Sequence, residues 1–281
     1  ADANVLSNAF LGATVIADET DVHYDAGVRL KGSFVGRNVP RVGFNVRFQP
    51  DRLFRGVHAR LAVDRSQHVA IAQGEIIAKH IASKAGGIPN MYDDLARFIH
   101  VLPGYNSSCQ LRLTGFEKEY LDSSWPDGGD GRMYELESLR YSSSTADGTV
   151  DGTKLPGQGY ANPELQDRGD DKEAYRWNWL LSNQRDEDDY APAMSVAKLF
   201  SMTGTAFDTA SKTRLDVDQW MRGMAYQTFV GPGDAIYTGG NIHNIRFYAR
   251  PHDGRMLYMP WDWDSVWQRG TTASLVAGGN V

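Results

Sequence analysis

A hairpin near the end of the chain constrains the fold more than any other feature of the sequence. Two strand-like runs, NIRFYAR and RMLYMPW, are separated only by the tight-turn sequence PHDG. Such runs predict β-strands, and so short a turn obliges them to pair antiparallel. Because a hairpin returns its end to its beginning, Asn244 at its start is expected to lie near Asp262 and Asp264. We therefore predict a hairpin over residues 244–264 that gathers polar groups at one end.

The stretch MPWDWDSVW, residues 259–267, places two carboxylates among three tryptophans. Alternate residues on an extended segment point the same way, so Asp262 and Asp264 are expected to converge on one point. Two like charges held that close need a cation, a shared proton or basic partners. The alternative is a loop whose aspartates cap backbone N–H groups or pair with arginines, and this stretch alone leaves that alternative open.

The first third of the chain has the pattern of an antiparallel sheet with one helix. AGVRLKGSF and VGFNVRF are joined by a glycine-bearing turn, and ARFIHVLPG and SSCQLRLTGF add two more predicted strands. Between these pairs, SQHVAIAQGEIIAKHIASKAGGIP predicts a helix that ends at Gly86, Gly87 and Pro89. We expect residues 1–115 to form a β-rich lobe.

The remainder of the chain is first polar and then helical. A segment at about 138–176 has the polar, glycine-rich composition of loops. Further on, LDVDQWMRGMAYQTFV has helical spacing, and we interpret one apolar stripe as core-facing: Val217, Trp220, Met221, Met224 and Phe229. Residues 116–281 are thus expected to form a more helical lobe with a polar insertion, which makes the fold class α+β.

Bulk properties exclude several classes of function. The net charge of −6 argues against non-specific binding of nucleic acid, and no apolar run is long enough to span a membrane. Cys109 is the single cysteine, so no internal disulfide can form, and the histidines lack zinc-like spacing. The sequence also contains no nucleophile elbow, Walker loop or complete dinucleotide-binding fingerprint.

Oxygen-bearing side chains late in the chain point to metal-assisted phosphoryl transfer. Asp234 follows the predicted helix, and Asn244, Asp262 and Asp264 belong to the hairpin. Asn and Asp suit hard cations such as Mg²⁺, Mn²⁺ or Ca²⁺, and nucleotide phosphates can complete the shell of Mg²⁺. In such a site one aspartate orients the acceptor hydroxyl, while an asparagine and a second aspartate hold the metal.

An earlier acidic segment is loosely similar to a calcium-binding loop. Asp127 and Asp130 are followed by Glu135 and Glu137, but the spacing misses that of an EF-hand. A solvated turn is the favoured interpretation.

Two charged residues of the first lobe fit a phosphate-binding pair. Arg47 lies in the second predicted strand and Glu75 in the helix that follows, which is the order of the strand cation and helix acid in protein kinases. Two simpler alternatives stay open. Glu75 can pair with Lys79 one turn along the helix, and Arg47 can face solvent.

Taken together, these segments resemble the CotH kinase family, which is distantly related to protein kinases. GVRLKGS, VGFNVRF and GEIIAKHIASKAGGIP are similar to its strands and helix, and GFEKEYLDSSW and RMYELE to the segments that join its lobes. LDVDQWMRGMAY, GPGD, HNIRFYAR and MPWDWDSVW follow in the order of the family. The resemblance implies a two-lobed, protein-kinase-like fold that binds ATP and Mg²⁺ or Mn²⁺, with Ca²⁺ as a further candidate ion.

The resemblance also implies residue roles. Asp234 matches the catalytic aspartate, Asn244 and Asp262 match metal ligands, and Asp264 matches their companion. Glu75 matches the helix glutamate, and we place Lys31 and Arg47 with it at the nucleotide. These assignments make the hairpin the active-site hairpin.

The sequence departs from the family pattern in four places. The basic cluster that often precedes the second strand is thinned to Arg41. Arg47 stands where lysine is usual, and the glycine expected a few residues beyond Asp264 is absent. The chain also ends soon after the motif, so that either the second lobe is truncated or the end is not the native one. These departures bear on activity more than on ancestry.

The function expected is an atypical secreted or cell-surface kinase that phosphorylates protein Ser or Thr hydroxyls. Two alternatives stay open: a non-catalytic surface or scaffold module of the same fold that binds calcium, and a metal-dependent glycosyltransferase that uses Asp-x-Asp to hold a sugar nucleotide. The expected partners are a protein substrate and a nucleotide, with neither nucleic acid nor a membrane span.

Overall fold

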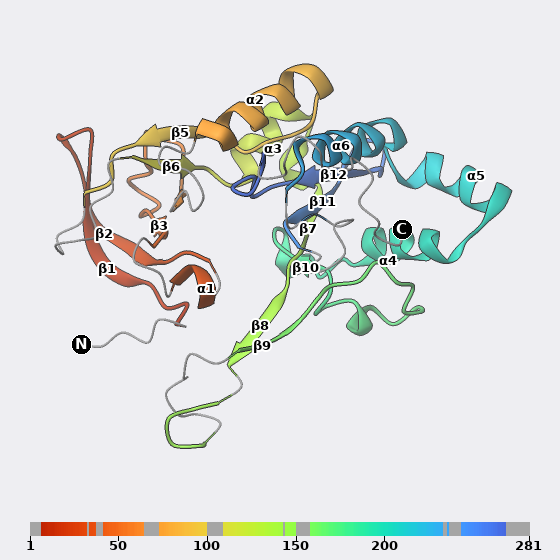
Figure 1. Cartoon of the computed structure of the whole chain (residues 1–281), viewed down its shortest axis with the longest axis horizontal. Coiled ribbons are helices and arrows are strands. Elements are labelled where there is room, and N and C mark those ends of the chain that lie inside the picture. The colour runs from red at the N-terminus through yellow and green to blue at the C-terminus, as the bar shows by residue number, and fades with distance from the viewer. Residues whose placement is uncertain are drawn as a thin grey trace. The chain divides into compact units, whose positions relative to one another are not determined.

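The computed structural model describes residues 7–32, 34–37, 42–64, 73–99, 109–142, 144–149, 158–232, 235 and 243–267. The chain divides into two compact units. Unit 1 consists of Ala1–Gln73, Met91–Glu119 and Arg140–Tyr160, and unit 2 of Gly74–Asn90, Tyr120–Leu139 and Ala161–Val281. Antiparallel sheets and helices alternate along the chain (Figure 1), which confirms the predicted α+β class.

Unit 1 is built on a six-stranded antiparallel sheet. Its strands follow the order β1-β2-β3-β4-β6-β5. Their bounds are β1 Leu11–Ala17, β2 Asp21–Leu30, β3 Phe44–Arg47, β4 Arg60–Asp64, β5 Asp93–Ala96 and β6 Gln110–Leu113. A short helix, α1 (Phe34–Arg37), follows β2.

Apolar residues around β3 alternate along the strand in the sheet of unit 1. Val42, Phe44, Val46 and Phe48 are all buried, whereas Arg47 between the last two is exposed. Side chains at alternate positions of a strand occupy one face, so one face of β3 packs into the core and the other carries Arg47.

The polar insertion contains two strands of its own, β8 (Leu139–Ser142) and β9 (Gln158–Ala161), which pair in a two-stranded sheet. Ahead of it lie α3 (Lys118–Ser124) and a 3₁₀ turn, Gly128–Asp130. Tyr248 donates to the carbonyl of Gly128 over 2.6 Å, and a Cβ at Gly131 would lie 2.3 Å from the same ring. This turn therefore needs glycine where the tyrosine ring approaches it.

Unit 2 contains a four-stranded antiparallel sheet in the order β10-β7-β11-β12. The bounds are β7 Arg132–Leu136, β10 Leu180–Leu181, β11 Ile245–Ala249 and β12 Met256–Pro260. Its helices are α2 Gln73–Gly86, α4 Ala191–Ala197, α5 Gly204–Arg214 and α6 Val217–Val230. A large aromatic core lies between the sheet and helices α4 and α6, with members including Tyr134, Trp179, Trp220, Phe247 and Tyr258.

Helix α6 packs against β12 through polar as well as apolar groups. Gln219 donates to the carbonyl of Tyr258 over 2.6 Å and accepts from its N–H over 2.8 Å. Gly223 lies where the Tyr258 ring approaches, since a Cβ there would be 2.8 Å from it. The predicted core stripe is therefore partly wrong: Trp220 is buried, but Met221 and Phe229 are 62% and 65% exposed. The buried side chains of α6 include Gln219 and Gln227, each of which is hydrogen-bonded to Tyr258.

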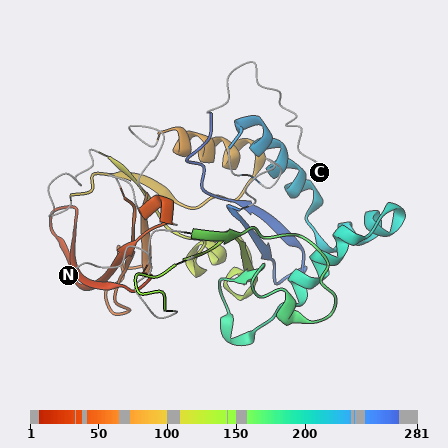
Figure 2. The same cartoon turned by 60° about the horizontal axis from the view of Figure 1, so that its bottom comes forward.

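Helix α2 belongs with α6 in unit 2 (Figures 1 and 2). The Tyr226 hydroxyl donates to the carbonyl of Ala78 over 2.7 Å, and Arg222 donates to that of Gly86 over 2.8 Å. The sequence assigned this helix to the first lobe, with residues 1–115. These bonds group it instead with the second compact unit, although the assignment of functional lobes stays a prediction.

Candidate functional site

Three strand ends meet at one edge of the sheet of unit 2. Ile245, the first residue of β11, pairs with Leu136 at the end of β7 on one side and with Pro260 at the end of β12 on the other. The Trp261 N–H donates to the carbonyl of Asn244 over 3.1 Å and extends the ladder by one residue. Asn244 therefore stands between Glu137 on one side and Trp261 on the other, and Asp262 follows Trp261 in the chain.

The backbone turns sharply at two of these positions. Asn244 and Asp262 have φ angles of 63° and 59°, in the left-handed region that few non-glycine residues adopt. Strain of this kind is concentrated at functional sites. The left-handed φ of Asp262 also shows that the expectation of an extended segment was wrong. The chain bends at Asp262 and enters a turn at Asp264, so strand alternation does not align the two side chains.

Glu137 lies near two other acidic side chains at this edge. Burial raises its pKa to about 8, and repulsion from Glu135 and Asp262 adds to the effect, while a backbone hydrogen bond from Ser138 and the charge of Arg246 oppose it. Arg246 pairs with Glu135 over 3.2 Å and lies over the Trp261 ring at 5.2 Å. Glu135 and Asp262 are thus close enough to Glu137 to act on it electrostatically.

Trp263 fixes the loop that carries the acids. Its side chain is fully buried in a cluster with Ala78 of α2 and with Val230 of α6. Asp262 and Asp264 flank it and are half-buried. The tryptophan thus anchors the two carboxylates to the helices of unit 2, which gives a structural reason for the apolar frame of MPWDWDSVW.

The predicted catalytic residue, Asp234, lies outside the described residues. Helix α6 ends before it at Gly231, whose φ of 61° makes it a left-handed cap, and the chain is described again at Ala235, which is buried. The role of Asp234 stays a prediction.

The cationic residues of unit 1 have separate partners. The Lys31 ammonium donates to Asp64, and the two side chains are 16% and 6% exposed. The Arg47 guanidinium lies over the Phe10 ring, 4.9 Å from its centre. The pair of Lys31 and Asp64 was not anticipated, and the only sequence signal for it is an acid at the end of an apolar strand.

Glu75 is buried in α2 beside Lys79, whose ammonium lies 3.9 Å from its carboxylate. This is the pairing that helical spacing offers as the simpler alternative. An ion pair between Glu75 and Arg47 would join the two compact units and stays a prediction.

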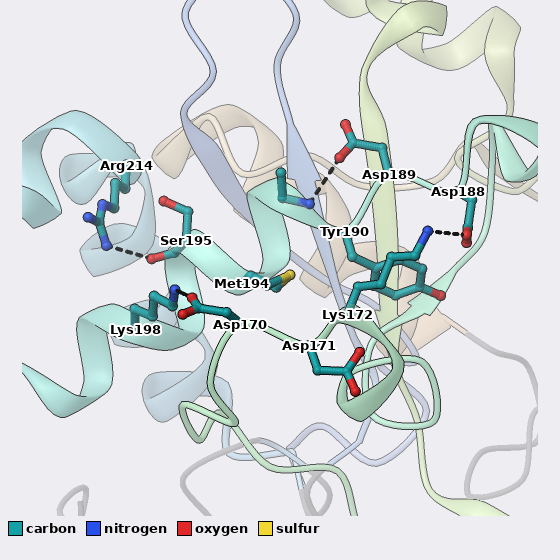
Figure 3. Close-up of a pocket in the computed structure, with 11 residues that line it drawn as sticks. Asp170, Asp171, Lys172, Asp188, Asp189, Tyr190, Met194, Ser195, Lys198 and Arg214 are labelled. Atoms are coloured by element: carbon teal, nitrogen blue, oxygen red, sulfur yellow. Dashed lines mark hydrogen bonds and ion pairs between the residues drawn. The ribbon is translucent and has the colours of Figure 1, made fainter.

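A cleft of about 680 Å³ lies elsewhere in unit 2, beside α4 (Figure 3). Its walls are mostly charged, and its lining is Asp170, Asp171, Lys172, Asp188, Asp189, Tyr190, Ala191, Met194, Ser195, Lys198 and Arg214. Lys172 pairs with Asp188 over 2.7 Å, Lys198 pairs with Asp170, and Arg214 donates to the Ser195 carbonyl. Because these cations are already engaged and no predicted site residue lines the cleft, we do not place the active site there.

The donor set at the sheet edge suits a hard cation. Among the residues that the structure describes, no group of three or more His, Cys, Asp or Glu side chains is arranged to hold a metal by itself. Two carboxylates and an amide oxygen, completed by nucleotide phosphates, are nevertheless the shell that Mg²⁺ takes in phosphoryl-transfer enzymes. Of the calcium-like segment, Asp127 precedes the 3₁₀ turn, Asp130 ends it and Glu135 lies in β7, so that these acids do not form one loop.

An α+β fold with oxygen ligands at the ends of a hairpin is consistent with the kinase class. The family described as CotH kinase protein matches residues 108–280, which is more than half of the chain, and the protein belongs to this family. Glu137 and the hairpin residues lie inside the match, whereas Lys31, Arg47 and Glu75 lie outside it. No curated protein matches the chain.

Membership supports a kinase-like function, for which the family uses ATP and a divalent metal. Among the described residues, no helix is both long and apolar enough to cross a membrane.

Proposed function

We propose that the protein is a metal-dependent phosphotransferase that moves the γ-phosphoryl group of ATP to Ser or Thr hydroxyls of a protein substrate. The observation that carries the proposal is the convergence of Asn244 and Asp262, with strained backbones, at the end of one hairpin within the family match. A site of this kind works mainly by positioning and by charge stabilisation.

The metal would be Mg²⁺ or Mn²⁺, held by Asn244 and Asp262 with Asp264 as their companion. When bound, it would neutralise charge on the β- and γ-phosphate oxygens. The acceptor hydroxyl oxygen attacks the γ-phosphorus, the bond between that phosphorus and the bridging oxygen breaks, and ADP leaves. The hydroxyl proton passes to the carboxylate of Asp234, which also orients the acceptor.

Lys31, Arg47 and Glu75 would serve the nucleotide phosphates. Lys31 is the best supported of these, because it is a largely buried cation held in place by Asp64. Glu75 is likewise buried, and Arg47 offers a fork of donors that can bridge phosphate oxygens.

The second candidate is a non-catalytic surface or scaffold module of the same fold. The exposure of Arg47, which stacks on Phe10 at the position where the family has lysine, favours this alternative. Such a module would bind neither ATP nor its metal at the hairpin, although calcium could still bind to its acidic loops. We also propose secretion or display at the cell surface, a location that rests on the family resemblance alone.

The decisive experiment compares two isosteric variants in the full chain. Asp262→Asn should weaken binding of Mg²⁺·ATP in calorimetry, because it removes a ligand charge. Asp234→Asn should leave that binding intact and lower the rate of phosphoryl transfer to a library of Ser and Thr peptides by on the order of 10²-fold or more. Equal loss of ATP binding in both variants would contradict this division of roles, and absence of ATP binding in the natural chain would favour the scaffold.

A further inference from the structure

Strand β1 leaves one edge of the sheet of unit 1 open. It stands at the end of the strand order, and among the described strands only β2 pairs with it (Figure 1). Its seven residues, LGATVIA, contain neither a charged side chain nor a proline, and Leu11 and Ile16 are 60% and 61% exposed. Natural edge strands are usually short, charged or broken by proline, because an open edge otherwise pairs with another chain.

The strand at the opposite end of the same sheet has the usual protection. Strand β5 is only four residues long, and it begins with Asp93 and Asp94. Short length and charge both discourage pairing with a further strand. Of the two ends of this sheet, β1 is therefore the one that is prepared to pair.

The bulge between β1 and β2 does not close the open edge. The register shifts between Ala13 and Val15, which leaves Thr14 opposite two residues of β2. The extra residue thus belongs to β2, on the side of β1 that is already paired. Strand β1 itself has no inserted residue along its free side.

The sequence of β1 is suited to pairing with itself. A two-fold axis at Thr14 would pair all seven residues antiparallel, with Thr14 opposite its own copy. Ile16 of one copy would then lie beside Gly12 of the other, where an added Cβ would meet no atom within 4 Å and the larger side chain has room. Threonine pairs across strands are stabilising, and like charges, which would oppose pairing, are absent from the sequence of β1.

Opposite charges flank the two ends of β1. The Arg29 guanidinium lies at its start, over the Phe10 ring at 5.3 Å from the centre. Asp18 and Glu19, in the turn that follows β1, are both exposed, and Asp18 has only a loose ion pair with Arg55 at 3.6 Å. A two-fold axis brings the acidic end of each copy to the arginine end of the other, so this contact occurs twice.

We propose that the protein forms a two-fold symmetric dimer in which β1 pairs antiparallel with β1 of a second copy, centred on Thr14. The sheet of unit 1 then continues across the dimer, and Asp18 and Glu19 of each copy face Arg29 of the other. None of these residues is assigned to the nucleotide or the metal, so the dimer does not depend on the proposed function.

Analytical ultracentrifugation of the full chain over a concentration series tests the dimer. The natural protein should dimerise reversibly, and added salt should weaken the dimer. Ile16→Lys puts a charge on the open edge and should raise the dimer Kd by about tenfold or more. Ile77→Lys is the matched control, because Ile77 is 53% exposed on α2 of unit 2, and it should leave the Kd unchanged.

A charge exchange tests which surfaces meet. Arg29→Glu should weaken the dimer, and so should the double variant Asp18→Asn with Glu19→Lys, because each places like charges at the contact between its own copies. Mixed in equal amounts, the two variants should form a heterodimer with nearly the natural affinity, since both contacts again join opposite charges. Circular dichroism of each variant checks that it is folded.

The outcomes decide for or against pairing through β1. Loss of the dimer in Ile16→Lys but not in Ile77→Lys, with recovery in the mixture, supports it. A natural chain that stays monomeric at every concentration overturns it. A dimer that survives in Ile16→Lys, or that Ile77→Lys disrupts instead, has its contact elsewhere and also overturns it. Folded charge variants that do not recover on mixing overturn the symmetric arrangement.

Discussion

Two carboxylates at strand ends, one in each compact unit, have opposite surroundings. Asp64 ends β4 in unit 1 and is met by the ammonium of Lys31. Glu137 follows β7 in unit 2 and is met by the like charges of Glu135 and Asp262. The first carboxylate belongs to an ion pair that the chain completes by itself. The second has acids as its strongest charged neighbours, with a weaker opposing effect of Arg246, so that burial and repulsion raise its pKa.

The largest effect on stability is expected for the ion pair of Lys31 and Asp64. Asp64→Asn should lower the free energy of unfolding by about 3–5 kcal/mol, because it leaves the largely buried charge of Lys31 uncompensated. Urea unfolding measures this change. Lys31→Met should have a similar effect, and the double variant should lose less than the sum of the two single losses. Additive losses would show that the two charges do not depend on each other.

Binding of metal and nucleotide at the hairpin should have the next largest effect on stability. At about 100 times Kd, Mn²⁺ with an ATP analogue should add about 2.7 kcal/mol to the free energy of unfolding of the natural chain. Asp262→Asn should abolish most of this gain in thermal unfolding while leaving the metal-free protein folded. If the Asp262→Asn variant were unfolded without metal, the carboxylate of Asp262 would be needed for folding, and a role as a metal ligand would lose its support.

The ion pair of Glu75 and Lys79 within helix α2 should have an intermediate effect on stability. Glu75 and Lys79 are both buried, with 3.9 Å between their charged groups, so we expect a coupling energy of about 1–2 kcal/mol in a double-mutant cycle. A second cycle with Arg47→Ala tests the pairing predicted from sequence. Coupling of Glu75 to Arg47, together with weaker ATP binding in Arg47→Ala, would restore the kinase-like pair. Coupling confined to Lys79 would favour the scaffold.

The smallest effect on stability is expected for an exposed ion pair. Asp208 and Lys212 lie 2.9 Å apart on α5 with both side chains well exposed. Their coupling energy should be about 0.3–0.5 kcal/mol at low salt and should fall as salt is added. A value as large as that of Asp64 and Lys31 would show that burial is not what distinguishes these pairs.

The sequence by itself determined the hairpin and its end groups. Strand alternation and the turn PHDG place Asn244 before β11 and Asp262 after β12, and pairing within so short a segment is local. The same local patterns led to the family, which the match over residues 108–280 shows. Local order along the chain was sufficient for these conclusions.

Only the tertiary structure decided what surrounds that hairpin. Periodicity indicates which residues share a face of a strand but not which strand lies beside it, so the place of Glu137 depended on the pairing of β7 with β11. The exposure of Met221 and the burial of Gln219 could not be predicted from the sequence for a related reason. A polar side chain is buried where a distant backbone supplies its hydrogen bonds, as Tyr258 does for Gln219, and no local pattern reports such a partner.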